Sequence, residues 1–291
     1  MTDWARIARD IAAARGRPFT IRDHRPLSGG CINRAWRVSG DDAVYFVKLN
    51  AANRLAMFEA EAAGLDEIAR SRTIRVPQPV TGGADESASW LVLEYIELAS
   101  DGDMAQLGEQ LARMHRVNAA QFGWQRDNTI GATPQINTPG GDWITFWRER
   151  RLGYQLALAA RNGHTGALQR DGERLMAALP ALLGEHHPQP ALLHGDLWGG
   201  NAGFDAAGAP VIFDPAAYYG DRETDIAMTE LFGGFSAAFH AAYRSAFPLD
   251  PGYETRKLLY NLYHVLNHAN LFGGGYPRQA EHMIGRLLAE L

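Results

Sequence analysis

The spacing of apolar residues indicates β-strands early in the chain and helices later. Apolar, β-prone runs occupy residues 35–38, 44–49 and 90–96, with turn residues such as Gly82-Gly83 outside them. Between the second and third run, the spacing predicts a helix over about residues 54–71. The first third of the chain is therefore expected to form a small lobe built around a sheet.

From Met104 onward the apolar residues recur at helical spacing. A strand-rich interruption at residues 191–214 is the exception. Further helical patterns cover residues 143–160, 168–183, 222–247 and 258–271. We therefore predict an α+β protein with a small β-rich N-lobe over residues 1–97 and a larger, mostly helical C-lobe over residues 98–291.

The N-terminal residues predict a helix rather than an export signal. Thr2 or Asp3 can cap a helix that carries Trp4 and Ile7 on one side and ends near Gly16. Charged residues interrupt this segment, so the apolar core of a signal peptide is missing. The longest stretch without Asp, Glu, Lys or Arg, residues 258–277, contains several Asn and His residues, which argues against a membrane span.

Composition narrows the classes of function. The chain has 291 residues, of which 46% are hydrophobic and 21% charged, as in a globular protein of about two domains. A net charge of −5 argues against a general nucleic-acid binder, which needs a basic surface to displace counterions. The single cysteine, Cys31, excludes a disulfide framework within one chain and favours a reducing, cytoplasmic compartment.

Lysine is rare, and one lysine interrupts an apolar strand. Only Lys48 and Lys257 occur among the 28 basic residues. Lys48 follows Val44-Tyr45-Phe46-Val47, where a buried ammonium needs an anion because an unpaired buried charge is costly. Glu61 lies on the inward face of the following predicted helix and can supply that anion. A strand lysine paired with a helix glutamate is either the phosphate-positioning pair of kinase-like enzymes or an ordinary buried ion pair.

The segment 192–214 carries the clearest chemistry. A short apolar strand ends in a loop with Asp196, and Asn201 follows five residues later, the D-x-x-x-x-N spacing of kinase catalytic loops. An aspartate can accept a hydroxyl proton, and an asparagine amide oxygen is a hard ligand for Mg²⁺. A predicted hairpin then leads to Asp214, at the end of a second apolar strand. The alternative, three turn residues in unrelated loops, does not explain their order and spacing.

A glycine-containing loop precedes Lys48 by one predicted hairpin. Gly29, Gly30 and Cys31 lie in it, and adjacent glycines let the backbone approach phosphate oxygens. The sequence has no G-x-x-x-x-G-K-[ST] motif, which excludes a P-loop NTPase, and no H-E-x-x-H or paired-cysteine motif typical of zinc enzymes.

At this point the chain resembles the fructosamine kinase (ketosamine-3-kinase) family. That family belongs to the aminoglycoside-phosphotransferase and choline-kinase branch of the protein-kinase-like fold. The resemblance rests on His194-Gly195-Asp196-Leu197-Trp198-Gly199-Gly200-Asn201, followed by Phe213-Asp214-Pro215-Ala216. Tyr218-Tyr219-Gly220-Asp221-Arg222-Glu223, Leu231-Phe232-Gly233-Gly234-Phe235 and Asn267-His268-Ala269-Asn270-Leu271-Phe272 agree as well.

The resemblance implies a bilobal protein-kinase-like fold and ATP- and Mg²⁺-dependent phosphorylation of the 3-hydroxyl of ketosamines, the sugar adducts that glycation forms on amines. It implies that Asp196 is the base and that Asn201 and Asp214 hold Mg²⁺. Lys48, held by Glu61, would orient the phosphates. The glycine loop would cover the nucleotide, and the backbone of Glu94, Tyr95 and Ile96 would bind adenine.

Several side chains keep two interpretations each. Trp198 either stacks on the sugar or its amine or is a core aromatic residue. His268, in a polar stripe with His264 and Asn267, either lines the substrate site or belongs to a buried hydrogen-bond network. Asp225 is expected to brace the catalytic loop rather than to contact substrate. Cys31 is either a small loop residue or a redox-sensitive thiol.

The expected partner is a small-molecule or protein-bound ketosamine, with neither nucleic acid nor membrane involved. We expect a monomer, and the redox interpretation of Cys31 adds a Cys31-linked dimer under oxidation. The alternatives are a kinase of the same fold acting on an aminoglycoside or a choline-like amine, a pseudokinase scaffold, and a metal-dependent hydrolase that uses His194, Asp196 and Asp214. A protein kinase is disfavoured because Asp214-Pro215-Ala216 stands where D-F-G is expected.

Overall fold

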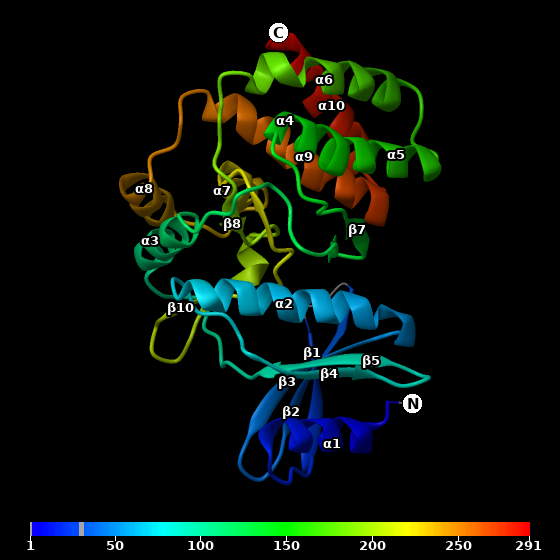
Figure 1. Cartoon of the computed structure of the whole chain (residues 1–291), viewed down its shortest axis with the longest axis vertical. Coiled ribbons are helices and arrows are strands. Elements are labelled where there is room, and N and C mark those ends of the chain that lie inside the picture. The colour runs from blue at the N-terminus through cyan, green and yellow to red at the C-terminus, as the bar shows by residue number, and fades with distance from the viewer. Residues whose placement is uncertain (1, 29–31) are drawn as a thin grey trace. The chain divides into compact units, whose positions relative to one another are not determined.

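The chain forms two compact units (Figure 1), described here from a computed structural model that covers residues 2–28 and 32–291. Unit 1 comprises Met1–Asp103 and Gly203–Pro215, and unit 2 comprises Met104–Ala202 and Ala216–Leu291. An antiparallel sheet dominates unit 1 and helices dominate unit 2, in agreement with the predicted α+β class.

Unit 1 is built on a five-stranded antiparallel sheet with the strand order β1-β2-β3-β5-β4. The strands are β1 (Asp23–Leu27), β2 (Arg34–Ser39), β3 (Val44–Asn50), β4 (Pro79–Ala84) and β5 (Ser89–Glu94). Its helices are α1 (Trp4–Arg15), a short 3₁₀ turn (Ala52–Arg54) and α2 (Leu55–Ser71). β1 and β4 have no counterpart among the predicted strands, and Gly82 and Gly83 lie within β4 rather than in a turn.

The two helices serve opposite faces of this sheet. Val47 and Leu49 of β3 pack in one core with Ile7 and Ile11 of α1. Because side chains alternate along a strand, Lys48 points to the other face, where α2 lies. The Asp3 side chain caps α1 at Arg6 N–H as predicted, and Gly16 ends the helix with a φ of 67°.

The hairpin of β9 (Ala202–Phe204) and β10 (Pro210–Ile212) belongs mainly to unit 1. Ala99 and Phe204 exchange backbone hydrogen bonds of 2.8 and 3.0 Å, and Ile212 N–H donates to Arg75 O at 3.0 Å. The predicted lobes, 1–97 and 98–291, differ from the compact units because these long-range backbone bonds attach the hairpin to unit 1.

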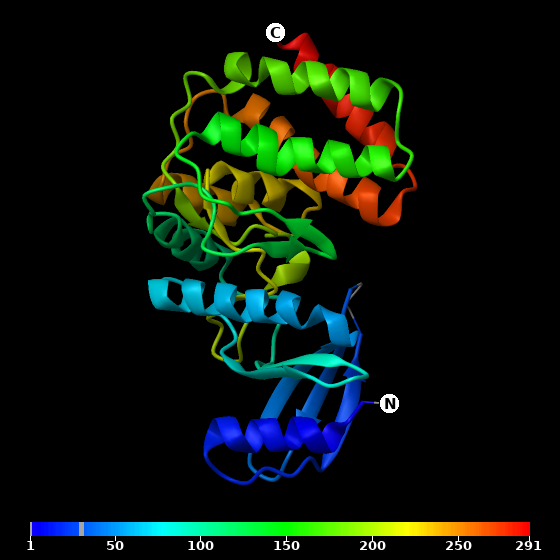
Figure 2. The ribbon, with the colours of Figure 1, turned by 45° about the vertical axis from the view of Figure 1, so that its right-hand side comes forward.

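Unit 2 is mostly helical, and Figure 2 shows α5, α6, α9 and α10 as a group of long helices. Its helices are α3 (Met104–Met114), α4 (Trp143–Phe146), a π-helical segment (Trp147–Leu152), α5 (Gly153–Arg161), α6 (Ala167–Leu183), a 3₁₀ turn (Gly199–Asn201), α7 (Glu223–Leu231), α8 (Ala237–Ala246), α9 (Tyr253–Phe272) and α10 (Tyr276–Ala289). Short strand pairs are formed by β6 (Asn128–Ile130) with β7 (Thr133–Gln135) and by β8 (Ala191–Leu193) with β11 (Tyr218–Gly220).

The helix predicted over residues 222–247 is interrupted. α7 ends at Leu231, and Gly233 and Gly234 follow with φ angles of 77° and 97°, which a helix cannot accommodate. Ser236 then caps α8. The sequence analysis also placed no helix where α10 lies, although Pro277 at its start is typical of a first helical turn.

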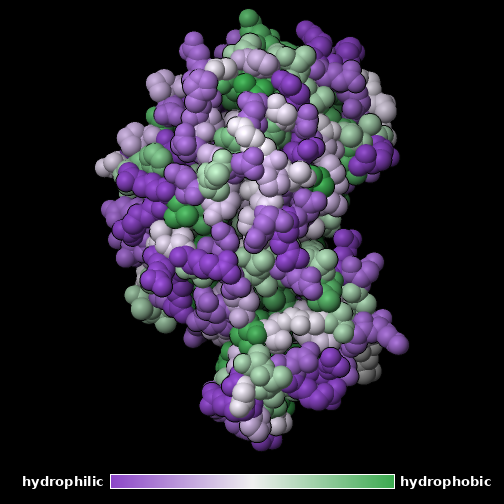
Figure 3. Space-filling view, viewed as in Figure 1, coloured by the Kyte–Doolittle hydropathy of each residue, from purple (hydrophilic) through white to green (hydrophobic). Residues whose placement is uncertain are grey.

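The face seen in Figure 3 is largely hydrophilic, with hydrophobic residues in small separate areas. Within the described part of the chain, none of the helices combines the length and the apolar character needed to cross a membrane.

Candidate active site

Lys48 is the centre of an ion cluster contained within unit 1. Its Nζ donates to Glu61 Oε1 at 2.6 Å and to Asp214 Oδ1 at 2.5 Å. The side chains of Lys48 and Glu61 are only 5% and 11% exposed, whereas that of Asp214 is 45% exposed. The predicted pairing of Lys48 with Glu61 is therefore present, and Asp214 adds a second carboxylate that the sequence analysis did not place there.

This cluster keeps the lysine charged. Burial alone would lower the pKa of Lys48, but the carboxylates of Asp214 and Glu61 outweigh burial and raise that pKa above its usual value. Burial raises the pKa of Glu61, an effect that Lys48 opposes. Of the two carboxylates around the ammonium, Asp214 is the one that solvent can reach.

Asp214 has an unusual backbone. Its φ of 57° lies in the left-handed region, which aspartate tolerates better than most residues but which still costs energy. Such conformations cluster at functional sites. The hairpin thus ends in a strained residue that also forms an ion pair.

At the end of β5, Glu94 already forms hydrogen bonds within the protein. Glu94 N–H donates to Gln78 O at 2.8 Å, and the Glu94 carboxylate accepts from Arg75 at 2.7 Å. Arg75 also pairs with Asp205 of the hairpin, a link that the sequence analysis missed. Within the described residues, the N–H groups of Tyr95 and Ile96 donate to no other backbone group. Of the three residues predicted to contact adenine, Tyr95 and Ile96 therefore have backbone N–H groups that could donate to a ligand.

In unit 2, a sharp turn precedes Asp196. Gly195 has a φ of 82°, and a Cβ there would lie 2.2 Å from Ala216 O, so only glycine fits. Ala216 N–H in turn donates to His194 O at 2.9 Å. Asn201 Nδ2 donates to Asp196 O at 2.9 Å and to its Oδ2 at 3.3 Å. The structure thus brings together the two ends of the predicted D-x-x-x-x-N motif.

Asp225 of α7 holds this loop from below the surface. Its Oδ2 accepts from His194 N–H at 2.7 Å, and its Oδ1 accepts from Gly195 N–H at 2.8 Å. His115, at the end of α3, lies 3.1 Å from Oδ2 through Nε2 and is fully buried. The expectation that Asp225 braces the loop is confirmed. His115 was not among the predicted site residues, although its position four residues after the inward-facing Leu111 marks a titratable group on a buried face.

The bonds around Asp225 favour its ionised form. Burial alone would raise the pKa of this carboxyl group, but the hydrogen bond from His115 and the N–H of Gly195 bring its pKa below the usual value. A buried carboxylate that accepts backbone N–H groups is a strong anchor, because charge-assisted hydrogen bonds are stronger than neutral ones.

The two predicted substrate residues are both accessible. Trp198 is 40% exposed, so the alternative of a core aromatic residue is wrong. His268 is partly exposed, whereas Asn267 is buried and bonded to Ile130 O and to Gln155. Burial lowers the pKa of His264 to about 3, so its ring is neutral. Within the polar stripe of α9, Asn267 therefore belongs to a buried hydrogen-bond network and His264 is buried, whereas His268 is partly exposed.

Three predicted nucleotide residues, Gly29, Gly30 and Cys31, lie outside the described residues. In sequence they fall between β1 and β2. Their predicted contact with phosphate, and the Cys31-linked dimer, stay predictions.

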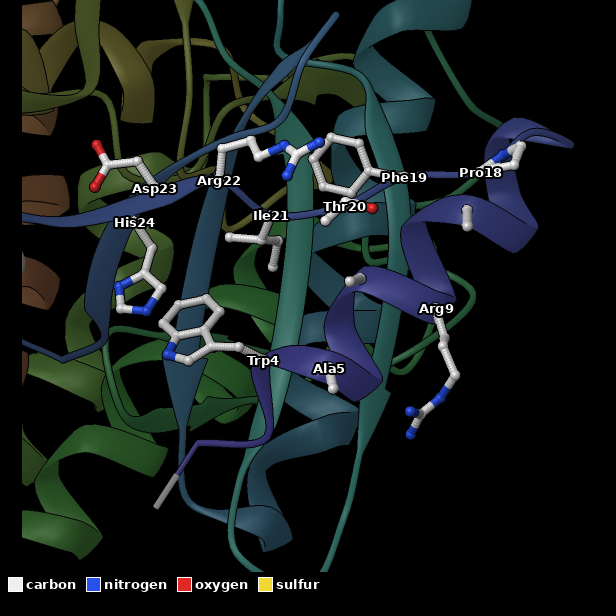
Figure 4. Close-up of a pocket in the computed structure, with 12 residues that line it drawn as sticks. Trp4, Ala5, Arg9, Pro18, Phe19, Thr20, Ile21, Arg22, Asp23 and His24 are labelled. Carbon is white, nitrogen blue, oxygen red and sulfur yellow. The ribbon is translucent and has the colours of Figure 1, made fainter.

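A separate groove of about 760 Å³ lies within unit 1, between α1 and residues 18–24 (Figure 4). Trp4 stacks on His24 at one end, with ring centroids 4.4 Å apart. Arg22 and Asp23 line it, but both already form ion pairs, with Asp41 and Arg25. None of the predicted site residues that the structure describes lines this groove.

Known proteins resemble this chain over its whole length. A protein of Synechocystis sp. assigned as a ketoamine kinase is 50% identical over 98% of this chain and 97% of its own. The protein-ribulosamine 3-kinase of Arabidopsis thaliana is 43% identical over 97% of this chain and 88% of its own. Matches of this extent include residues of both units.

Solved structures agree with the sequence matches. A protein of Haemophilus somnus 129PT assigned as a fructosamine-3-kinase has a TM-score of 0.90 and 29% identity, over 97% of this chain and 96% of its own. A choline kinase of Streptococcus pneumoniae has a TM-score of 0.62 and 14% identity, over 99% of each chain, which shows the kinase-like fold. The sequence model that describes fructosamine kinase matches residues 3–290. The chain therefore belongs to the fructosamine kinase family and is an ATP-dependent kinase.

Proposed function

We propose that this protein transfers the γ-phosphoryl group of ATP to the 3-hydroxyl of a ketosamine. The observation that carries the proposal is the Asp196 loop, held by the buried Asp225 in a chain that matches fructosamine kinases from residue 3 to residue 290. Phosphoryl transfer depends on positioning and on charge stabilisation, and both units supply residues suited to these tasks.

Lys48 is the proposed phosphate ligand. Its raised pKa keeps it cationic over the physiological range, and Glu61 holds its ammonium at 2.6 Å. A compact point charge on a strand is suited to the oxygens of a phosphate chain. Tyr95 and Ile96, with their available N–H groups, are the proposed adenine contacts.

Asn201 and Asp214 are the proposed Mg²⁺ ligands. The amide nitrogen of Asn201 is engaged by Asp196, so its bonds with described residues leave the amide oxygen open. Asp214 uses Oδ1 for Lys48, and its side chain is 45% exposed. Amide and carboxylate oxygens are the ligands that Mg²⁺ prefers, so both residues fit. When bound, Mg²⁺ neutralises charge on the transferring phosphate.

Asp196 is the proposed base. Its carboxylate accepts the proton of the O3 hydroxyl, the O3–P bond forms, the bond between the γ-phosphorus and the bridging oxygen breaks, and ADP leaves. Asn201 orients Asp196 through the 3.3 Å bond to its carboxylate.

The product has a chemical consequence. O3 of a ketosamine is bound to C3, the carbon next to the C2 carbonyl, and phosphorylation turns this poor leaving group into a good one. Loss of a proton from C1 gives an enaminol, phosphate leaves from C3, and water hydrolyses the resulting imine to release the amine, which makes the reaction a deglycation step.

The test uses a fructose adduct of an amine and the matching 3-deoxy adduct, each with ATP and Mg²⁺. Mass spectrometry should detect one added phosphoryl group on the first compound and none on the second. Asp196→Asn should lower kcat by at least about 10²-fold while ATP still binds, because a positioned base contributes this much. Asp171→Asn, on the surface of α6, is the matched control. Phosphorylation of the 3-deoxy adduct, or near-normal turnover by Asp196→Asn, would refute the proposal.

A further inference from the structure

Unit 2 exposes a cluster of aromatic rings that the reaction as proposed does not use. The His268 ring lies 4.9 Å from that of Phe232, 5.5 Å from that of Phe272 and 5.0 Å from that of Tyr276, measured between centroids. Phe232 is 41% exposed and Phe272 is 52% exposed. We call these four residues the aromatic platform.

Such exposure is unusual for the described part of this chain. It has five exposed large hydrophobic residues, and Phe232, Phe272 and Trp198 account for three of them. Grouped apolar exposure on a soluble protein is typical of a binding surface, whereas single exposed residues need no explanation.

Glycines build the platform from two separate parts of the chain. Gly273 and Gly274, with φ angles of 65° and 61°, reverse the chain between α9 and α10 and so bring Phe272 and Tyr276 to the same histidine. Phe232 arrives from the end of α7, where Gly233 and Gly234 break the helix.

The platform is continuous with the catalytic loop. A Cβ on Gly234 would lie 2.7 Å from the Cα of Gly199, so the segment after Phe232 packs directly against the segment after Trp198. Along α9, His268 follows His264 by one turn, about 6 Å of helix. α9 also packs against α7, the helix that carries Asp225.

We propose that the aromatic platform binds the amine side of the ketosamine, namely its secondary ammonium group and the hydrocarbon arm attached to it. This inference rests on the proposed function, because it assigns a place to the half of the substrate that is not phosphorylated. Only a few covalent bonds separate O3 from the amine nitrogen. When O3 lies at Asp196, the hydrocarbon arm on that nitrogen therefore extends over the protein surface next to the Asp196 loop.

The chemistry of the platform matches this occupant. Aromatic faces attract cations through the ring quadrupole, and their area also covers a hydrocarbon chain. His268 Nδ1 lies 2.8 Å from His264 O and donates to it, so in the neutral ring Nε2 is an acceptor. Within the described residues Nε2 has no hydrogen-bond partner, and an ammonium N–H can supply one.

The test compares two adducts that share the sugar and the ammonium but differ in the arm, the fructose adducts of methylamine and of n-hexylamine. Wild type should show a lower KM for the hexylamine adduct. Phe232→Ala and Phe272→Ala together should raise the KM for that adduct by about fivefold to tenfold and raise it less for the methylamine adduct. Leu291→Ala, which removes an exposed apolar side chain elsewhere in unit 2, should leave the ratio of the two KM values unchanged.

Single variants and a conservative one complete the design. Phe272→Leu keeps apolar area without a π face, so it should retain part of the preference for the long arm. Each single alanine variant should give part of the effect of the double variant, with unchanged thermal unfolding because both rings are exposed. Unchanged KM values for both adducts in the double variant would overturn the platform proposal and leave the kinase proposal standing. Failure of wild type to phosphorylate either adduct would overturn both.

Discussion

Lys48 in unit 1 and Asp196 in unit 2 are held in place by opposite means. Lys48 is a buried charge fixed by direct contact with two other charges, Glu61 and Asp214. Asp196 belongs to a loop that is fixed through its backbone. The N–H groups of His194 and Gly195 donate to a third carboxylate, that of the buried Asp225. In unit 1, ion pairs fix the Lys48 side chain directly. In unit 2, hydrogen bonds fix the backbone before Asp196, and the backbone sets the position of the Asp196 side chain.

This difference predicts different failures. Damage to the Lys48 cluster leaves buried charge uncompensated, which costs stability in a pH-dependent way. Damage to the Asp225 anchor leaves main-chain donors unpaired and releases the loop. The first should weaken the use of ATP, and the second should slow the transfer step.

Lys48→Met should produce the largest effect. Removing one partner of a buried ion pair costs about 3–5 kcal/mol, because Glu61 stays buried beside Asp214. Burial and Asp214 then raise the pKa of Glu61 without the opposing ammonium. A carboxyl group with a raised folded-state pKa stabilises the fold at low pH and loses this contribution as pH rises through that pKa. The stability loss should therefore be greater at about pH 8 than at about pH 5, measured by denaturant unfolding.

The double variant Lys48→Met/Glu61→Gln is the control for that prediction. It removes the buried carboxylate together with its partner, so it should recover much of the lost stability while activity stays low. If the double variant were no more stable than Lys48→Met, the loss would not come from an uncompensated charge.

Asp225→Asn should have the next largest effect. The amide keeps the volume but not the charge, and charge-assisted bonds to His194 and Gly195 N–H become weaker, at a cost of about 2–3 kcal/mol. We expect a strong loss of kcat with little change in the KM for ATP. Steady-state kinetics with ATP varied would separate this from Lys48→Met, which should raise the KM for ATP. An increase in that KM with normal kcat would contradict the indirect role of Asp225.

The part of the candidate site that could be predicted consists of polar and charged residues whose position or spacing stands out in the sequence. Lys48 and Glu61 stood out because each occupies an inward position, and Asp196 and Asn201 stood out through their spacing. The bond from Lys48 to Asp214 could not be found this way, since it spans 166 residues and depends on where the hairpin packs. The same holds for Arg75, whose partners Glu94 and Asp205 come from two different strand pairs.

The fold was predictable to a similar extent. Strands β2, β3 and β5 contain the apolar, β-prone runs that predicted them, but β1 is largely polar and lies at the edge of the sheet. Phe232 and Phe272 end helices, where an aromatic residue looks the same in sequence whether it packs inward or stays exposed. Their exposure depends on glycine turns that only the folded chain brings together.

Gly234→Ala should have a smaller effect that is confined to unit 2. Its Cβ would meet the Cα of Gly199 at 2.7 Å, so the catalytic-loop segment must move, at about 1–3 kcal/mol. Gly233→Ala is the matched control, because its φ of 77° imposes a similar backbone strain with nothing within 4 Å. The difference between the two variants in kcat and in KM for the ketosamine measures the contact alone. Identical behaviour would show that the close approach is unimportant.

The smallest expected effect concerns His186, which precedes β8 and lies far in sequence from its partners. Its Nε2 is 2.7 Å from Asp221, and its Nδ1 is 3.3 Å from Asp250; Glu223 and Arg256 also face it. Burial alone would lower the pKa of His186, but Asp221 and Glu223 outweigh it and raise that pKa.

A histidine with a raised folded-state pKa stabilises the fold fully below its unfolded pKa, about 6.5, and loses this contribution as pH rises through the folded value. His186→Gln should therefore lower the melting temperature more at about pH 6 than at about pH 9. His187→Gln changes the exposed neighbour and should show no such trend. His186 precedes β8, which leads into the Asp196 loop. A loss of melting temperature that does not change with pH would mean that packing, rather than charge, holds this segment. In that case His186 would differ from Lys48, which is held by charge.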